Sequence, residues 1–319
     1  MAKSSKLQVF GAKIEATQGT VPTFTAADYC LVDSAVVNPA PEFLKREYKH
    51  ATLGALASIL GKLRVDVTVK VAIKGGASAT TPYAPHSALM QAAGLIETIS
   101  TGVVYAFASS SISNFAGFCK SCSMEVYEAG PSPLKHQIKG CVAKSAKLVA
   151  KAGGFLMLEA TYQGLYVPVT DAAFPTVTLA ESIKEPVFAS SSLSMQTYSG
   201  IVSSIEIDFG LETVEREDSA APYGVGGFAV LGRRVIGSLD PEAVNVATHD
   251  FFGIMLSRAT GALTFNINGA AAGNRFAFSM PKIQYDDVAW AERGLIKTFK
   301  VPFTATENTG DDDLTITIS

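Results

Sequence analysis

Charged residues are scarce in this chain. Asp, Glu, Lys and Arg together make up 17% of its 319 residues, whereas soluble domains usually carry about 25%. So little charge favours a protein that buries part of its exterior against other subunits, although a rather apolar monomer would give the same composition. The net charge of −3 argues against a protein that binds nucleic-acid phosphates, because such proteins are usually basic.

Long apolar runs are also missing. No stretch approaches the ~18 uncharged apolar residues of a membrane helix. The first residues, MAKSSKLQVFGAK, contain no apolar segment of signal-peptide length. We therefore expect no membrane insertion and a product that stays in the cytoplasm.

Cysteine is rare too, with four residues: Cys30, Cys119, Cys122 and Cys141. Cys119 and Cys122 form a CxxC pair, but the sequence has no second CxxC or HxxxH pair to complete a zinc site. A redox CxxC normally opens a helix, whereas this pair precedes an alternating segment. We expect four structural thiols, with metal or redox chemistry as the less favoured alternative.

Signatures of catalysis are absent. The sequence contains no GxSxG, HExxH or P-loop motif, and its four histidines stand apart from carboxylates and cysteines. The acidic run at 311–313 suits a solvated turn better than a calcium loop, which needs alternating oxygen ligands and a glutamate. Trp290 and Tyr285 could stack on bases, but packing in a core or an interface suits them better. We therefore expect that the protein is not an enzyme and that it has no catalytic, cofactor-binding or metal-binding residues.

The clearest pattern is a strand at residues 63–73. Every second residue there is apolar, and polar or small residues lie between. Alternation of period two predicts a strand with one buried and one wet face. Such a strand suits the wall of a broad antiparallel sheet or barrel.

Further strands and two short helices are expected along the chain. One helix should begin at Pro85 and end at Gly94, and the other should begin after a cap at Asp250 and end at Gly261. Strands are expected at residues 6–16, 31–38, 103–108, 121–128, 137–142, 155–162, 201–211, 263–268, 275–285, 295–306 and 314–318.

The order of elements occurs twice. Each half has a strand pair with a long excursion, then one helix, then more strands; the excursions cover residues 42–61 and 213–227. Leu60-Gly61-Lys62 in the first half resembles Leu231-Gly232-Arg233 in the second. We therefore predict an internal duplication, with domains at residues 1–178 and 179–319.

Several stretches resemble one protein family. They are VTVKVAIKGGASATTPYAPHSALMQAAGLIET (67–98), AKIEATQGTVPTFTAADYCLV (12–32), PYG with RRVIGSLDPEA (222–243), and PKIQYDD with a later KVPFTATE. Together they are similar to the tail tube protein, or major tail protein, of long-tailed bacteriophages. The Cys-rich stretch 118–122 departs from that likeness.

The resemblance implies a fold and a function. The fold would be mainly β: two tandem tail-tube-like β-sandwich or barrel domains, each with one short α-helix, whose inner sheets join between subunits into a closed barrel. The protein would be a structural virion protein that self-assembles into stacked rings, forming the conduit for DNA ejection. Two other classes stay open: a soluble β-sandwich binding module of a virion or cell surface, and a membrane β-barrel, against which the missing signal peptide argues.

The same resemblance implies partners and a location. The protein would bind itself, the tape-measure, tail terminator and distal tail proteins, and would let viral DNA pass without specific binding. It would be assembled in the host cytoplasm and end in the virion tail. Three two-domain chains would supply the six positions of a ring, so a trimer is favoured over a hexamer whose second domains lie outside.

Two sets of surface residues are expected to matter for assembly. The excursions are long, charged at their start and rich in Ala or Gly afterwards, so we expect ring-to-ring contacts there, ordered only in the assembly. The stacking candidates are Lys45, Arg46, Glu47, Lys49, Leu53, Leu56, Glu215, Arg216 and Tyr223.

The second set consists of carboxylates that should face the channel. Duplex DNA is a dense line of negative charge, so a wall that must release it quickly should show few cations and some carboxylates. Asp66, Glu206 and Asp208 alternate with apolar neighbours and should face away from the core, and Glu125 is a further candidate. Exposure on the outer surface of the tube is the alternative.

Overall fold

A computed structural model describes residues 7–49, 54–108, 119–128, 133–179, 181–269 and 271–319. The predicted central strand is present as β4 (Ile59–Ala72). Its odd-numbered valines from Val65 to Val71 are at most 2% exposed, while the residues between them face the other side of the sheet. The alternation therefore predicted both the strand and its buried face.

The first half of the chain forms an antiparallel sheet around β4. The strand order is β3 (Ser34–Leu44), β4, β9 (Met157–Tyr166), β8 (Leu134–Lys151), β7 (Cys122–Glu128), β1 (Gln8–Ile14) and β2 (Tyr29–Cys30). A one-turn 3-10 helix, η1 (Ala26–Asp28), precedes β2, and the short β10 (Thr170–Asp171) pairs with the start of β8.

The second half has a similar order of strands. The order is β12 (Val202–Asp208), β15 (Ile236–Pro241), β19 (Ile296–Thr306), β17 (Arg275–Tyr285), β16 (Thr260–Asn268) and β11 (Leu193–Met195). β18 (Ala289–Arg293) forms a hairpin with β19, and β20 (Thr315–Ile318) pairs with β17. In each half a first strand (β3 or β12) pairs with a second strand (β4 or β15). The second strand pairs on its other side with a strand near the end of that half (β9 or β19).

Two strand pairings join the halves into one network of 18 strands. The last third of β8 pairs with β12, and β20 pairs with β6 (Val103–Ala106), which in turn pairs with β5 (Ile96–Ile99). Both pairings cross the expected boundary at residues 178/179. The division into two domains stays a prediction, and the halves are hydrogen-bonded to each other along two strand edges.

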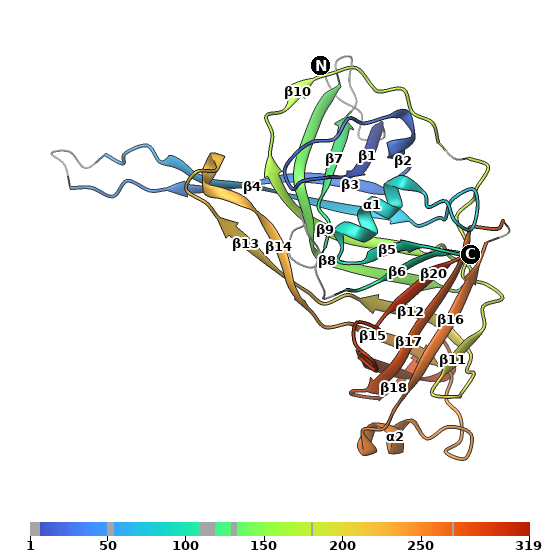
Figure 1. The fold of residues 1–319 in the computed structure, drawn as a ribbon. Coiled ribbons are helices and arrows are strands. Elements are labelled where there is room, and N and C mark those ends of the chain that lie inside the picture. Colours follow the sequence, from blue (N-terminus) through green and yellow to red (C-terminus); the bar gives the residue numbers. More distant parts are fainter. Residues whose placement is uncertain (1–6, 50–53, 109–118, 129–132, 180, 270) are drawn as a thin grey trace.

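Strand pairing reaches into both predicted excursions (Figure 1). β3 and β4 extend far from the body as one arm, and β13 (Leu211–Glu217) with β14 (Val225–Arg233) forms a second arm beside it. A short 3-10 turn, η2 (Pro222–Gly224), connects β13 and β14. Strands cover residues 42–44 and 59–61 of the first excursion and 213–217 and 225–227 of the second. These parts are ordered within one protomer, and the role of the excursions as ring-to-ring contacts stays a prediction.

Both predicted helices are present. α1 (Ala84–Ala92) has Pro85 in its first turn, and eight of its nine residues are buried among β1, β5, β7 and β8. α2 (Phe251–Ser257) begins where the Asp250 side chain accepts a hydrogen bond from the Gly253 N–H at 2.8 Å. It ends earlier than predicted, because Arg258 adopts a left-handed conformation at its C-terminus (φ 55°) and the chain continues as β16. In the described residues no helix is long and apolar enough to span a membrane.

Candidate assembly surfaces

A ladder of alternating charges crosses the wet face of the joined sheet. Lys70 lies 3.2 Å from Glu159, which lies 3.3 Å from Lys147, which lies 3.2 Å from Glu206. Burial acts to raise the pKa of Glu159, but hydrogen bonds from Lys70 and Lys147 lower it overall. Glu159 and Glu206 are therefore paired with ammonium groups. Single-strand patterns do not predict these pairs, because each pair joins two different strands.

Three of the four predicted channel carboxylates share this face. Asp66 lies on β4, on the side that carries Lys70, and its carboxylate is 4.0 Å from Arg64. Glu206 belongs to the ladder. Asp208 lies two residues further along β12, and its carboxylate accepts a hydrogen bond from the Gly210 N–H at 2.8 Å.

Glu125 lies elsewhere. It is only 3% exposed, and its carboxylate accepts hydrogen bonds from the hydroxyls of Tyr29 and Tyr127 at 2.8 and 3.0 Å. Lys135 completes the site at 2.6 Å. A buried carboxylate with these partners ties β2, β7 and β8 together, so we leave Glu125 out of the proposed channel face.

Ion pairs hold the two arms side by side. Glu215 of β13 lies 3.2 Å from Lys62 and 3.4 Å from Arg64, both on β4, and Glu217 also pairs with Lys62. The hydrogen bond from Lys62 to Glu217 is the main cause that raises the pKa of Lys62 and lowers that of Glu217. Below the arm, a small apolar cluster joins the sheets; it contains Cys119, Val142, Val225, Phe228 and Val230.

The stacking candidates fall into two groups. Lys45, Arg46, Glu47, Lys49 and Leu56 are exposed at the far end of the β3–β4 arm, and Arg216 and Tyr223 are exposed on the second arm. Glu215 is partly buried by its ion pairs within the protomer. Leu53 lies outside the described residues.

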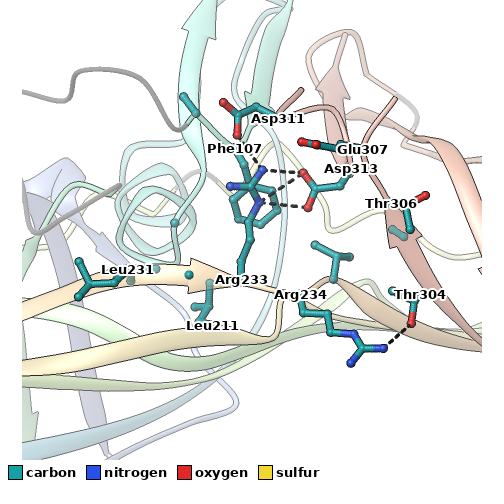
Figure 2. Close-up of a pocket in the computed structure, with 16 residues that line it drawn as sticks. Phe107, Leu211, Leu231, Arg233, Arg234, Thr304, Thr306, Glu307, Asp311 and Asp313 are labelled. Carbon is teal, nitrogen blue, oxygen red and sulfur yellow. Dashed lines mark hydrogen bonds and ion pairs between the residues drawn. The ribbon is translucent and has the colours of Figure 1, made fainter. Parts of the chain in front are cut away.

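A cavity of about 540 Å³ lies at the base of the second arm. Figure 2 shows Arg233 between Asp311 and Asp313, each at 2.8 Å, with its guanidinium 4.4 Å from the centre of the Phe107 ring. Burial acts to lower the pKa of Arg233, but the two carboxylates raise it overall. Since both acids already neutralise this arginine, it clamps the arm to the segment before β20 and offers no open charge to an anion.

The four cysteines are all buried. Burial raises the pKa of Cys30 and of Cys119 to about 12, and Cys122 lies opposite Cys141 on the paired strands β7 and β8. Thiols with such pKa values hold little reactive thiolate near neutral pH. The CxxC pair thus contributes to packing.

Exposed apolar side chains gather at the β18–β19 hairpin. Trp290 is 62% exposed although it packs on Phe252 and Phe299, and Leu295 and Ile296 are also exposed. Tyr285, by contrast, is fully buried. Exposed apolar patches are typical of interaction surfaces, and the sequence signal for this one was the isolated tryptophan.

The comparisons with known proteins agree with this reading of a structural protein. No curated protein sequence matches the chain. A family model described as phage tail tube protein matches residues 5–319. Because that match covers nearly the whole chain, the protein belongs to the phage tail tube family, whose members are structural proteins of the virion tail and not enzymes.

Proposed function

We propose that the chain polymerises as stacked rings into the tube through which viral DNA leaves the virion. The observation that carries this proposal is the repeated strand order: β3–β4–β9 in the first half and β12–β15–β19 in the second. Two sheets of one design, already joined edge to edge within the chain, are suited to extend into a ring of such sheets. A closed ring also removes the exposed strand edges that would cause aggregation.

The ladder face is proposed to line the channel. Its charges alternate, so DNA passing along it would meet paired ions instead of a cationic surface that binds phosphates. Asp66, Glu206 and Asp208 would then be channel residues. A density map of the tube with these side chains on the outer surface would contradict this assignment.

The arms are proposed to connect successive rings. The β3–β4 arm projects from the body and exposes both charged and apolar residues at its end (Figure 1). Deleting residues 51–58, of which 51–53 lie outside the described residues, should leave soluble rings that no longer stack. If electron micrographs show that this variant still forms long tubes, the proposed role of the arm is disproved.

At its ends the tube would meet other tail proteins. We propose that the terminator, the distal tail protein and the tape-measure protein contact the same surfaces that rings use among themselves, with the tape measure inside the channel. Purified protein at rising concentration tests the central claim, because it should form tubes visible by negative-stain microscopy. A protein that stays monomeric at every concentration would favour a binding module instead.

A further inference from the structure

We propose that the outer edge of β18 in one copy pairs with the outer edge of β3 in the next copy. The strands would run antiparallel, with Ala289–Arg293 against residues 34–38, so that Trp290 lies opposite Val37 and Ala291 opposite Val36. This inference rests on the proposed ring and names the strands that close it. It is argued from the pairing of β8 with β12, which joins the two halves within one chain.

The internal repeat can be aligned residue by residue. In the first half one row of paired, buried residues crosses three strands, and a matching row crosses three strands of the second half. The rows are Ala35–Val69–Ala160 and Ile205–Leu239–Val301. The next rows, two residues along, place the buried aromatic rings of Tyr162 and Phe303 at equivalent positions. β3 is thus equivalent to β12, β4 to β15, and β9 to β19.

The hairpins extend this equivalence to β18. Leu148 of β8 pairs with Leu158 of β9, and Trp290 of β18 pairs with Phe299 of β19. Since Leu158 and Phe299 are equivalent by the row alignment, the end of β8 corresponds to β18. Each of these two strands forms a hairpin with the strand that follows it.

The end of β8 has a partner on its other side, and β18 has none among the described residues. β12 covers that part of β8, with Ile207 opposite Leu148, and Leu148 is 2% exposed. The equivalent Trp290 is 62% exposed. The missing partner of β18 is therefore the equivalent of β12, which is β3, and in the described residues β3 pairs only with β4. A second copy supplies it.

Proline sets the length of the available edge. Pro39 and Pro41 lie within β3 and cannot donate hydrogen bonds, so their nitrogens must face the outer edge if the β4 ladder is complete. The open part of β3 therefore stops at Asn38. The remaining residues, 34–38, match the five residues of β18 and the five-residue contact of β12 with β8.

One side chain occupies this edge in the protomer. The Gln8 amide donates to the Ala35 carbonyl at 2.6 Å, and the Ala35 N–H donates to the Gln8 oxygen at 3.1 Å. These are the hydrogen bonds that a neighbouring strand would make. Gln8 stands in for β18 until the second copy docks and must then turn away.

Side-chain chemistry at the two joints is complementary in different ways. At the joint within the chain, Lys147 and Glu206 form an ion pair. The equivalent residues at the proposed joint are Ala289 and Val36, and Val36 is 49% exposed in the protomer. An apolar contact replaces the ion pair, so the strands can pair without leaving a charge unmatched.

The same equivalence between the two joints also predicts where the β3–β4 arm of the next copy lies. The second arm fills the apolar cluster above Leu165, whose equivalent in the second half is Thr306. Thr306 lines the cavity of Figure 2 together with Arg234, the equivalent of Arg64. The hollow at the second joint lies where the first joint is filled by an arm, so the β3–β4 arm of the next copy would cover it.

Disulfide trapping tests the register. All four native cysteines are buried, so an added pair would supply the exposed thiols. The double variant Val36→Cys/Ala291→Cys should form tubes under reducing conditions and, after oxidation, give covalently linked chains on a non-reducing gel. Opposite residues on paired strands are close enough for this bond. The control Val37→Cys/Ala291→Cys shifts one thiol to the other face of the strand and should stay uncrosslinked.

The outcomes separate this inference from the proposed function. Tubes without crosslinks in the Val36→Cys/Ala291→Cys variant would overturn the β3–β18 pairing and leave the tube intact, and equal crosslinking in the control would overturn the register. Crosslinked chains that never form tubes would support the pairing and count against the tube. A variant that gives neither tubes nor crosslinks would overturn both the β3–β18 pairing and the proposed tube.

Discussion

Trp290 is the only tryptophan in the chain, and 62% of its surface is exposed in the protomer. If β3 of another copy covers it, its surroundings become apolar on assembly. We expect its fluorescence emission to shift to shorter wavelength, and quenching by iodide to weaken, as rings form. Emission that stays the same in protomers and tubes would contradict burial of this residue.

Gln8 gives a second expectation at the scale of single residues. Its amide must leave Ala35 before β18 can pair there. The variant Gln8→Ala should therefore shorten the lag before tubes appear, as measured by light scattering. Gln18→Ala is a suitable control, because Gln18 bonds to the Phe228 carbonyl, away from the β3 edge. Slower assembly of Gln8→Ala than of this control would show that Gln8 supports the edge instead of blocking it.

We expect His86 to make the stability of the protomer depend on pH. Burial at the start of α1 lowers its pKa from 6.5 to about 3, and its Nδ1 accepts a hydrogen bond from the Lys74 N–H at 3.0 Å. Between these two values the unfolded chain binds the proton and the folded chain does not. The free energy of unfolding should therefore fall as pH drops below 6.5, by about 2 kcal/mol at pH 5 from this group.

Urea unfolding of the unassembled protomer at pH 7 and pH 5 measures this effect. In His86→Asn the side-chain oxygen can replace Nδ1 as acceptor, and no group titrates there. The loss between the two pH values should be smaller in this variant than in the wild type. An equal loss would assign the pH dependence to other groups.

At the scale of elements, the ion pairs between the arms should limit the motion of β13 and β14. Glu215→Gln removes the charge that faces Lys62 and Arg64. Partly exposed pairs contribute about 0.2–1 kcal/mol each, so amide exchange in β14 should become about two- to fivefold faster. Glu212→Gln, on the same strand, is the matched control, and equal exchange in both variants would assign the order of the arm to packing alone.

Periodicity predicted the strands well where one face is wet. The strands expected at residues 63–73 and 201–211 follow from this pattern, because their side chains alternate between core and water. It did not predict that the edge strand β3 continues through Pro39 and Pro41, since a proline interrupts a strand only when its nitrogen faces a partner. It also gave no sign that β8 extends to Lys151, because residues 143–151, AKSAKLVAK, do not alternate between apolar and polar residues.

The candidate surfaces were less visible in the sequence than the strands. Asp66 and Glu206 could be assigned to a wet face from their own strands alone. Their pairing with lysines depends on which strands are neighbours, and single-strand patterns do not contain that information. Glu125 fits the same alternating pattern as an exposed carboxylate, but it is buried with hydroxyl and ammonium partners.

For the whole molecule, the predicted internal duplication leads to an expected size of the ring. If each chain supplies two equivalent positions, three chains close a six-position ring by head-to-tail contacts. Native mass spectrometry of rings from the 51–58 deletion should then give three times the mass of the variant chain, which is eight residues shorter than the 33.5 kDa wild type. A single species at six times that mass would show that only one half of each chain builds the wall.

The pairing of β6 with β20 has a consequence for how the chain folds. Val103–Ala106 finds its partner at Thr315–Ile318, so the sheet that contains β5 and β6 stays open until β20 has been synthesised. Contacts between such distant residues slow folding, because a long loop must close before any stabilisation is gained. The protomer therefore cannot finish folding until nearly the whole chain has been synthesised. The first half expressed alone would keep an unpaired edge on β6, which would promote aggregation.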